Sequence, residues 1–130
     1  MINTLLQLRE IQKIIKEQQI IMKRLLMPQV NDYSFIPRYY KLFCTLFADI
    51  PYKSVYHRGK FIYVILYLYS PGALIGGRTR IGLREALAKV FNINDKQIIS
   101  KNIGDLRFYF DNYKDFRDDV ELFYKKVKID

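Results

Sequence analysis

The nine-residue segment from Phe61 to Tyr69, FIYVILYLY, constrains the fold most, because every residue in it is apolar or aromatic. It is much shorter than the about 18 apolar residues that indicate a membrane span. Its β-branched and aromatic residues favour a strand, whereas apolarity on every side is typical of a buried helix. No second strand pattern exists in the chain, so a strand would leave its backbone groups unpaired. The sequence therefore predicts a buried helix, in which Tyr63 and Tyr67 share one face and serve the core rather than stack on bases.

Length and composition exclude several classes of protein. The chain has 130 residues, 50% of them hydrophobic, which is enough for one domain with its own core. Its one cysteine, Cys44, can form neither an internal disulfide nor a cysteine-based metal cage, and it favours a reducing compartment. Charged Arg9, Glu10 and Lys13 interrupt the apolar stretch that a signal peptide would need. We therefore expect a cytoplasmic protein without a membrane span.

Residues 4–27 have the pattern of an amphipathic helix that stops before Pro28. Apolar side chains recur at steps of three and four, and one heptad frame has Gln18 as the only polar residue among its a and d positions. The remaining positions of that frame are Leu8, Ile11, Ile15, Met22 and Leu25. This stripe indicates either a homodimer through residues 4–27 or packing on the protein's own body. A membrane interface is a third alternative, which the absence of Trp and Phe from the apolar face disfavours.

Residues 28–36, PQVNDYSFI, contain turn formers without periodicity, and we interpret them as a linker. A helix is predicted from Pro37 to Asp49, because proline suits a first helical turn and Pro51 ends the element. Cys44 lies in the apolar run of this helix and is expected to be buried and inert. The one histidine, His57, lies beyond a turn, so a Cys–His catalytic pair is not expected. The residues expected to face inward are Tyr40, Phe43, Leu46 and Phe47.

The formal net charge of +9 is unevenly distributed. Residues 1–60 hold ten basic and four acidic side chains, residues 61–110 hold seven and three, and residues 111–130 hold five and six. The last segment is therefore outside any basic surface. An excess of this size indicates a polyanionic partner, either nucleic acid or acidic lipid, although solubility alone can also favour it. The densest basic island comprises Arg58, Lys60, Arg78, Arg80, Arg84 and Lys89.

The loop at residues 73–82, ALIGGRTRIG, places three glycines beside Arg78 and Arg80. Backbone freedom and guanidinium groups together suit contact with phosphate groups. The glycines form neither a P-loop nor a dinucleotide-binding fingerprint, so nucleotide hydrolysis is not indicated. The loop is thus either a phosphate-contacting segment or a mobile surface loop.

Two short helices joined by a tight turn follow this loop. The first is predicted at residues 83–91, the turn at 92–94 and the second helix at 95–110. Asn94 and Gln97 match a variant of the capping box at the start of the second helix. The inward face of that helix is predicted to be Ile99, Ile103, Leu106 and Phe110.

This unit, from Leu83 to about Leu106, resembles the helix-turn-helix of bacterial and phage DNA-binding proteins. Ala88 takes the place of the small residue at which the helices approach, and Asn92 stands where the family usually has glycine, a change that a left-handed backbone tolerates. The resemblance implies that the second helix enters the major groove of DNA. The residues it implies for phosphate contact are Arg78, Arg80 and Arg84, and those for the groove are Lys96, Gln97, Ser100 and Lys101.

A final helix is predicted at residues 112–126, with an acidic first half that faces solvent. Its acidic residues are Asp115, Asp118, Asp119 and Glu121, and its inward residues are Phe116, Val120, Phe123 and Val127. We therefore predict an all-α protein with an arm helix at 1–27, a linker at 28–36, and a compact bundle of about five helices at 37–130 that contains the helix-turn-helix at 83–110.

The leading function is DNA binding by a small regulatory or architectural protein of the phage or mobile-element type. The alternative is a non-enzymatic assembly or adaptor protein that binds other proteins through its arm helix and its aromatic surface. The sequence indicates no catalytic residues, metal ligands, cofactor or small-molecule substrate.

Overall fold

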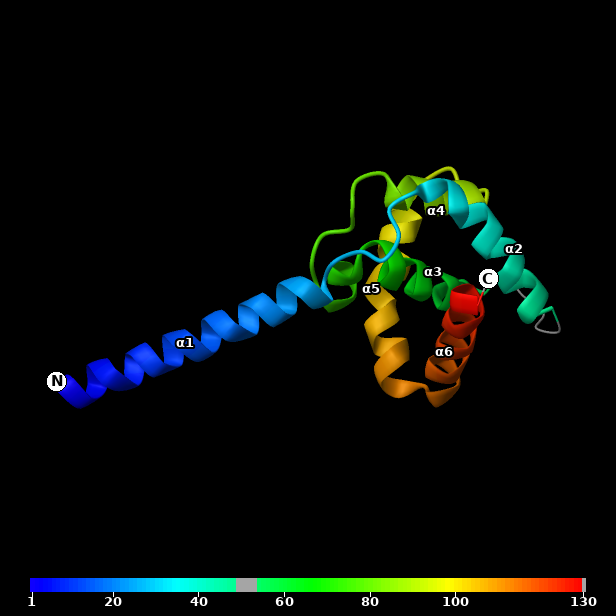
Figure 1. Ribbon diagram of the computed structural model, residues 1–130. Helices are drawn as coiled ribbons and strands as arrows, with labels where there is room; N and C mark the ends of the chain where they lie inside the picture. The colour runs from blue at the N-terminus through cyan, green and yellow to red at the C-terminus, as the bar shows by residue number, and fades with distance from the viewer. Residues whose placement is uncertain (49–53, 130) are drawn as a thin grey trace.

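The computed structural model describes residues 1–48 and 54–129, which form six α-helices, two short 3-10 helices and no strand. The α-helices are α1 (Ile2–Leu25), α2 (Ile36–Leu46), α3 (Val55–Tyr69), α4 (Leu83–Val90), α5 (Lys96–Asn112) and α6 (Lys114–Ile129). The 3-10 helices are η1 (Tyr33–Phe35) and η2 (Pro71–Ile75). Figure 1 shows α1 extending away from a bundle that the other five helices make. The predicted all-α class, with an N-terminal helix and a bundle of about five, is confirmed.

α3 is the central helix of the bundle. Nine of its residues are buried, and the helix contacts α2, α5, α6 and η2. Its first turn is capped by Ser54, whose hydroxyl oxygen accepts a hydrogen bond from the His57 amide at 3.0 Å. The buried helix predicted at residues 61–69 is confirmed, and the helix begins six residues earlier than the apolar run. Tyr63 packs against the core as predicted, but the prediction that Tyr67 also serves the core was wrong, because Tyr67 is 41% exposed.

Two polar contacts join α3 to α6 at the edge of the apolar core. The Lys60 ammonium donates to Asp119 Oδ2 at 2.7 Å, and only 6% of the Lys60 side chain is exposed. The Tyr56 hydroxyl donates to Asp115 Oδ2 at 2.8 Å, and burial, followed by this hydrogen bond, raises the pKa of Tyr56. The prediction of a wholly solvated acidic face on the last helix was therefore wrong, because α6 turns part of that face toward α3.

α2 buries one face and leaves Cys44 on the other side. Ile36 and Phe43 are buried along the inward face, and Phe47 follows them at the end of the helix. Cys44 comes one residue after Phe43, which turns it about 100° around the helix axis, and it is exposed. The prediction of a buried thiol was therefore wrong. The predicted helix end at Asp49 and the stop at residue 51 lie outside the described residues.

The segment at residues 28–36, interpreted as a linker, contacts the bundle at several points. The amides of Gln29 and Val30 donate to the Leu68 carbonyl at 2.9 and 3.1 Å. The Tyr69 hydroxyl donates to the Asp32 carbonyl at 2.7 Å. These bonds attach the chain that follows α1 to the C-terminal end of α3.

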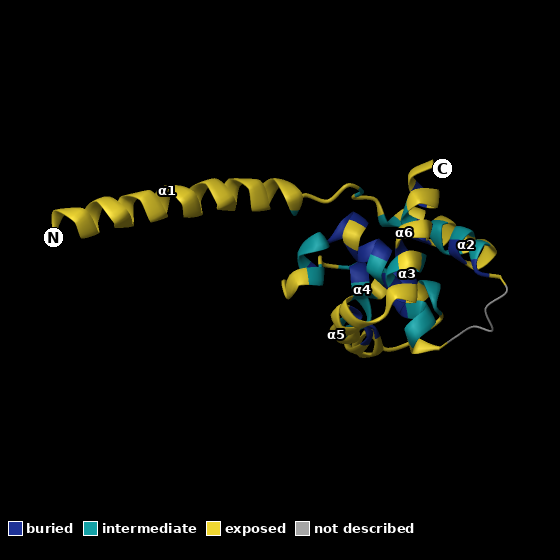
Figure 2. Cartoon of the chain, turned by 90° about the horizontal axis from the view of Figure 1, so that it is seen from below, coloured by how far each residue is buried: buried dark blue, intermediate teal, exposed yellow. Residues whose placement is uncertain are grey.

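α1 has no buried residue along its 24-residue length. Figure 2 shows it exposed from end to end and separate from the bundle. The helix predicted at residues 4–27 is confirmed, with both ends two residues nearer the N-terminus. The alternative in which this helix packs on the protein's own body is contradicted, because its apolar stripe faces solvent.

Candidate nucleic-acid interface

A left-handed residue shapes the turn between α4 and α5. Asn92 has a φ of 56°, which is the left-handed conformation that asparagine was expected to tolerate here. The Ile93 amide donates to the Ala88 carbonyl at 2.8 Å, and the Asn92 amide donates to the Lys89 carbonyl at 3.1 Å. This pair of bonds forms a Schellman motif, which satisfies carbonyls at the end of α4. Ala88 itself is buried, so α5 can approach α4 closely.

The start of α5 is capped by a different residue from the one predicted. The Asp95 carboxylate accepts a hydrogen bond from the Gln97 amide at 2.8 Å. Asn94 was predicted to cap the helix, and that prediction was wrong, because Asp95 has the extended backbone (φ −119°, ψ 114°) of an N-cap residue. Ile99 and Leu106 face the core, as the apolar spacing predicted.

A hollow of about 310 Å³ beside α5 is lined by four polar side chains and Ile103. Arg78 and Thr79 come from the loop, Arg84 from α4 and Ser100 from α5. Arg84 Nη1 donates to the Ser100 hydroxyl oxygen at 2.7 Å, a bond that ties α4 to α5. Two guanidinium groups and two hydroxyls present many hydrogen-bond donors, which is the chemistry that a phosphate group requires. The structure thus brings together three of the predicted site residues.

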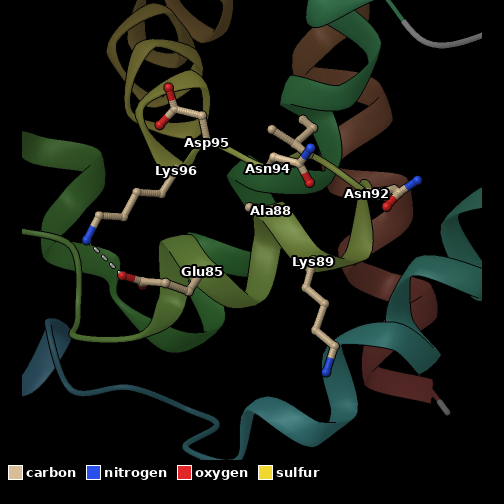
Figure 3. A pocket seen from close by; sticks show the side chains of 8 residues that line it. Glu85, Ala88, Lys89, Asn92, Asn94, Asp95 and Lys96 are labelled. Carbon is tan, nitrogen blue, oxygen red and sulfur yellow. Dashed lines mark hydrogen bonds and ion pairs between the residues drawn. The ribbon is translucent and has the colours of Figure 1, made fainter.

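A second hollow, of about 570 Å³, surrounds the turn itself (Figure 3). Lys96 extends from the start of α5 to Glu85 of α4, with 3.1 Å between its ammonium and the carboxylate, while Lys89 points away from this pair. A hydrogen bond from its own backbone amide, followed by the bond to Lys96, lowers the pKa of Glu85. The charge of Lys96 is therefore partly balanced within the protein.

The remaining predicted site residues lie in two places. Gln97 and Lys101 are both exposed on α5, one helical turn apart. Arg80 instead turns toward the segment before α2, where its Nη1 donates to Asn31 Oδ1 at 3.0 Å and its guanidinium lies 5.4 Å from the centroid of the Tyr33 ring. Arg80 is thus not among the residues that line the hollow beside α5.

Sequence reasoning missed a contact that holds α5 in place. Arg58 Nε donates to Asn102 Oδ1 at 2.8 Å, and its guanidinium lies 5.5 Å from the centroid of the Phe91 ring. Asn102 is buried three residues after Ile99, and this spacing was the available signal, because a buried amide needs a polar partner. Arg58 and the buried Lys60 therefore stabilise the bundle, and the exposed part of the basic island lies in the loop and on α4.

No protein-family model, curated protein or solved structure matches the chain. None of the helices within residues 1–48 and 54–129 combines the length and the apolar character needed to cross a membrane. The same residues contain no group of three or more His, Cys, Asp and Glu side chains placed to hold a metal ion.

Proposed function

We propose that the chain binds duplex DNA through α4, the turn and α5, as a small regulatory or architectural protein. The observation that carries this proposal is the hollow in which Arg78 and Arg84 lie beside Ser100, next to the exposed face of α5. A phosphate group of the DNA backbone would accept hydrogen bonds from both guanidinium groups. The N-terminal part of α5 would then enter the major groove.

The side chains of this surface divide between the two kinds of contact that DNA-binding proteins make. Phosphate contacts by Arg78 and Arg84 fix the register of the protein on the duplex. Arg84 can keep its bond to Ser100 while it binds a phosphate, because a guanidinium has five N–H donors. Gln97 suits a bidentate pair with adenine, and Lys101 suits guanine or a phosphate.

The test is a titration of labelled random-sequence duplex DNA at several salt concentrations, followed by fluorescence anisotropy. The double variant Arg78→Ala/Arg84→Ala removes two phosphate contacts, so the slope of log K against log salt should shrink by about 1.8. The matched control is Lys125→Ala/Lys126→Ala, which removes the same charge from an exposed part of α6 and should leave the slope unchanged.

Three results would contradict the proposal. The first is absence of binding at low salt, and the second is an equal loss of slope in the control variant. The third is equal affinity for an RNA duplex of the same length, since the narrow major groove of RNA does not admit a helix.

A second candidate function is that of a protein-binding adaptor. It is favoured by an aromatic hollow of about 270 Å³, whose lining includes Tyr63, Tyr67, Phe110 and Tyr124. Tyr67 is exposed and its ring lies 5.1 Å from that of Tyr124, an arrangement that suits an apolar side chain of another protein. An adaptor needs no affinity for DNA, so the titration separates the two functions.

A further inference from the structure

α1 exposes a whole stripe of large apolar side chains to solvent. Each of its large apolar residues is between 45% and 71% exposed. No side chain caps its N-terminus, and no packing within the described chain supports it. Helices in proteins take most of their stability from packing of an apolar face, so α1 lacks the support that its sequence is patterned to use.

The apolar residues of α1 form a continuous seam along the helix. Steps of three and four residues lead through Leu8, Ile11, Ile15, Gln18, Met22 and Leu25. Ile14 and Ile21 widen the seam on one side. A helix of 24 residues is about 36 Å long, so the seam provides three heptads of side chains for a partner.

We propose that α1 pairs with α1 of a second copy of this chain as a parallel, in-register coiled coil. The pairing uses residues that the proposed DNA contacts do not, and neither proposal depends on the other.

The charge pattern of α1 favours a second copy over a different helix. The positions that flank the seam are Gln12, Ile14, Gln19 and Ile21, none of which is charged. Two identical helices can therefore approach without placing like charges opposite each other. Coiled coils that select a different partner use charged residues at these flanking positions, and α1 has none there. Its charged residues all lie on the other faces: Arg9, Glu10, Lys13, Lys16, Glu17, Lys23 and Arg24.

Gln18 determines the orientation of the pair. It is the one polar residue of the seam, and it lies near the middle of the seam. In a parallel, in-register pair it meets Gln18 of the second copy, and each amide can donate to and accept from the other. An antiparallel pair would place it against Ile15 and leave it without a partner, which is costly at a buried site.

The first test compares two variants of the full chain by sedimentation equilibrium over a range of protein concentrations, without DNA. Ile15→Glu places a charge in the seam and should weaken self-association by at least about 100-fold. Ile20→Glu is the matched control, because Ile20 is 64% exposed and lies away from the seam, and it should leave the dimer mass unchanged. Near-UV circular dichroism of the tyrosines in both variants reports whether the bundle remains folded.

The second test fixes the orientation by cross-linking. Gln18→Cys in a Cys44→Ser background has a single thiol per chain, and mild oxidation should convert it to a disulfide-linked dimer. Cys44 is exposed in the natural chain, so its removal is needed for an unambiguous product.

Several outcomes would overturn the pairing. They are a monomer at every concentration, a mass above that of a dimer, equal effects of the two glutamate variants, or no cross-link at position 18. A monomer that binds anionic lipid vesicles through α1 would assign the seam to a membrane surface instead. Dimerisation of Arg78→Ala/Arg84→Ala should match that of the natural chain, which keeps a failure of this proposal distinct from a failure of DNA binding.

Discussion

The Lys60–Asp119 ion pair gives the most direct quantitative prediction for this bundle. Asp119→Ala removes the carboxylate that accepts from a lysine whose side chain is only 6% exposed. A bond between charged groups contributes about 1.5–3 kcal/mol, and loss of one partner of a buried pair costs about 3–5 kcal/mol. Asp119 is 27% exposed, so water can reach the ammonium from that side and the cost falls toward the lower range. We expect the free energy of unfolding to decrease by about 2–3 kcal/mol.

The assay is urea and thermal unfolding followed by near-UV circular dichroism, to which 11 tyrosines contribute. A loss of this size should lower Tm by about 8–24 °C in a bundle of this length. Asp118→Ala is the control, because Asp118 is the exposed neighbour of Asp119 and its replacement should cost no more than about 0.5 kcal/mol.

A double variant separates the pair itself from the cost of leaving one charge alone. Lys60→Met/Asp119→Leu removes both charges and should recover most of the stability lost in Asp119→Ala. The reasoning is refuted if Asp119→Ala costs less than about 1 kcal/mol. It is also refuted if the losses in the single variants Lys60→Met and Asp119→Leu simply add up to the loss in the double variant.

Two further predictions concern the turn and the one histidine. Asn92→Val should cost about 1–2 kcal/mol in urea unfolding, because its backbone is left-handed, whereas Asn92→Gly should be close to neutral. Burial, and then the charge of Lys60, lowers the pKa of His57 below its ordinary value of 6.5, so protonation favours the unfolded chain. The contribution of His57 to the free energy of unfolding should therefore be constant above pH 6.5 and should decrease as the pH falls toward the lower pKa that His57 has in the folded chain. The variant His57→Phe should remove this decrease.

Each of these two predictions, for Asn92 and for His57, has a result that would contradict it. Equal losses in the valine and glycine variants of Asn92 would show that the turn does not depend on its backbone conformation. An unchanged pH dependence in His57→Phe, measured from pH 7.5 down to about pH 5, would assign the titration to other groups.

Local patterns in the sequence predicted the elements that depend on near neighbours. The all-apolar run at residues 61–69 could only be satisfied by burial, and it is the central helix. The turn at Asn92 followed from the short spacing between two apolar patterns and from a residue that accepts a left-handed backbone. The inward positions Ile99 and Leu106 followed from spacing alone.

The predictions that were wrong depended on distant partners or on single-residue boundaries. Lys60 and Asp119 are 59 positions apart, and nothing local to either residue indicates the other. Asn102 meets Arg58 across 44 positions in the same way. The predictions for Cys44 and Asn94 were each wrong by one position. Cys44 lies one residue after the buried Phe43, and that step turns its side chain about 100° around the helix. The helix cap is Asp95, the residue after Asn94.

The isolation of α1 means that this chain should unfold in two separate processes, the melting of α1 and the cooperative unfolding of the bundle. No residue of α1 is buried against the part of the bundle that the structure describes, so the melting of α1 should not be coupled to the loss of the core. Ellipticity at 222 nm sums both processes, because 24 of the 130 residues belong to α1, and the curves it gives should depart from a single cooperative transition. The tyrosine signal reports the bundle alone, since α1 contains no aromatic residue.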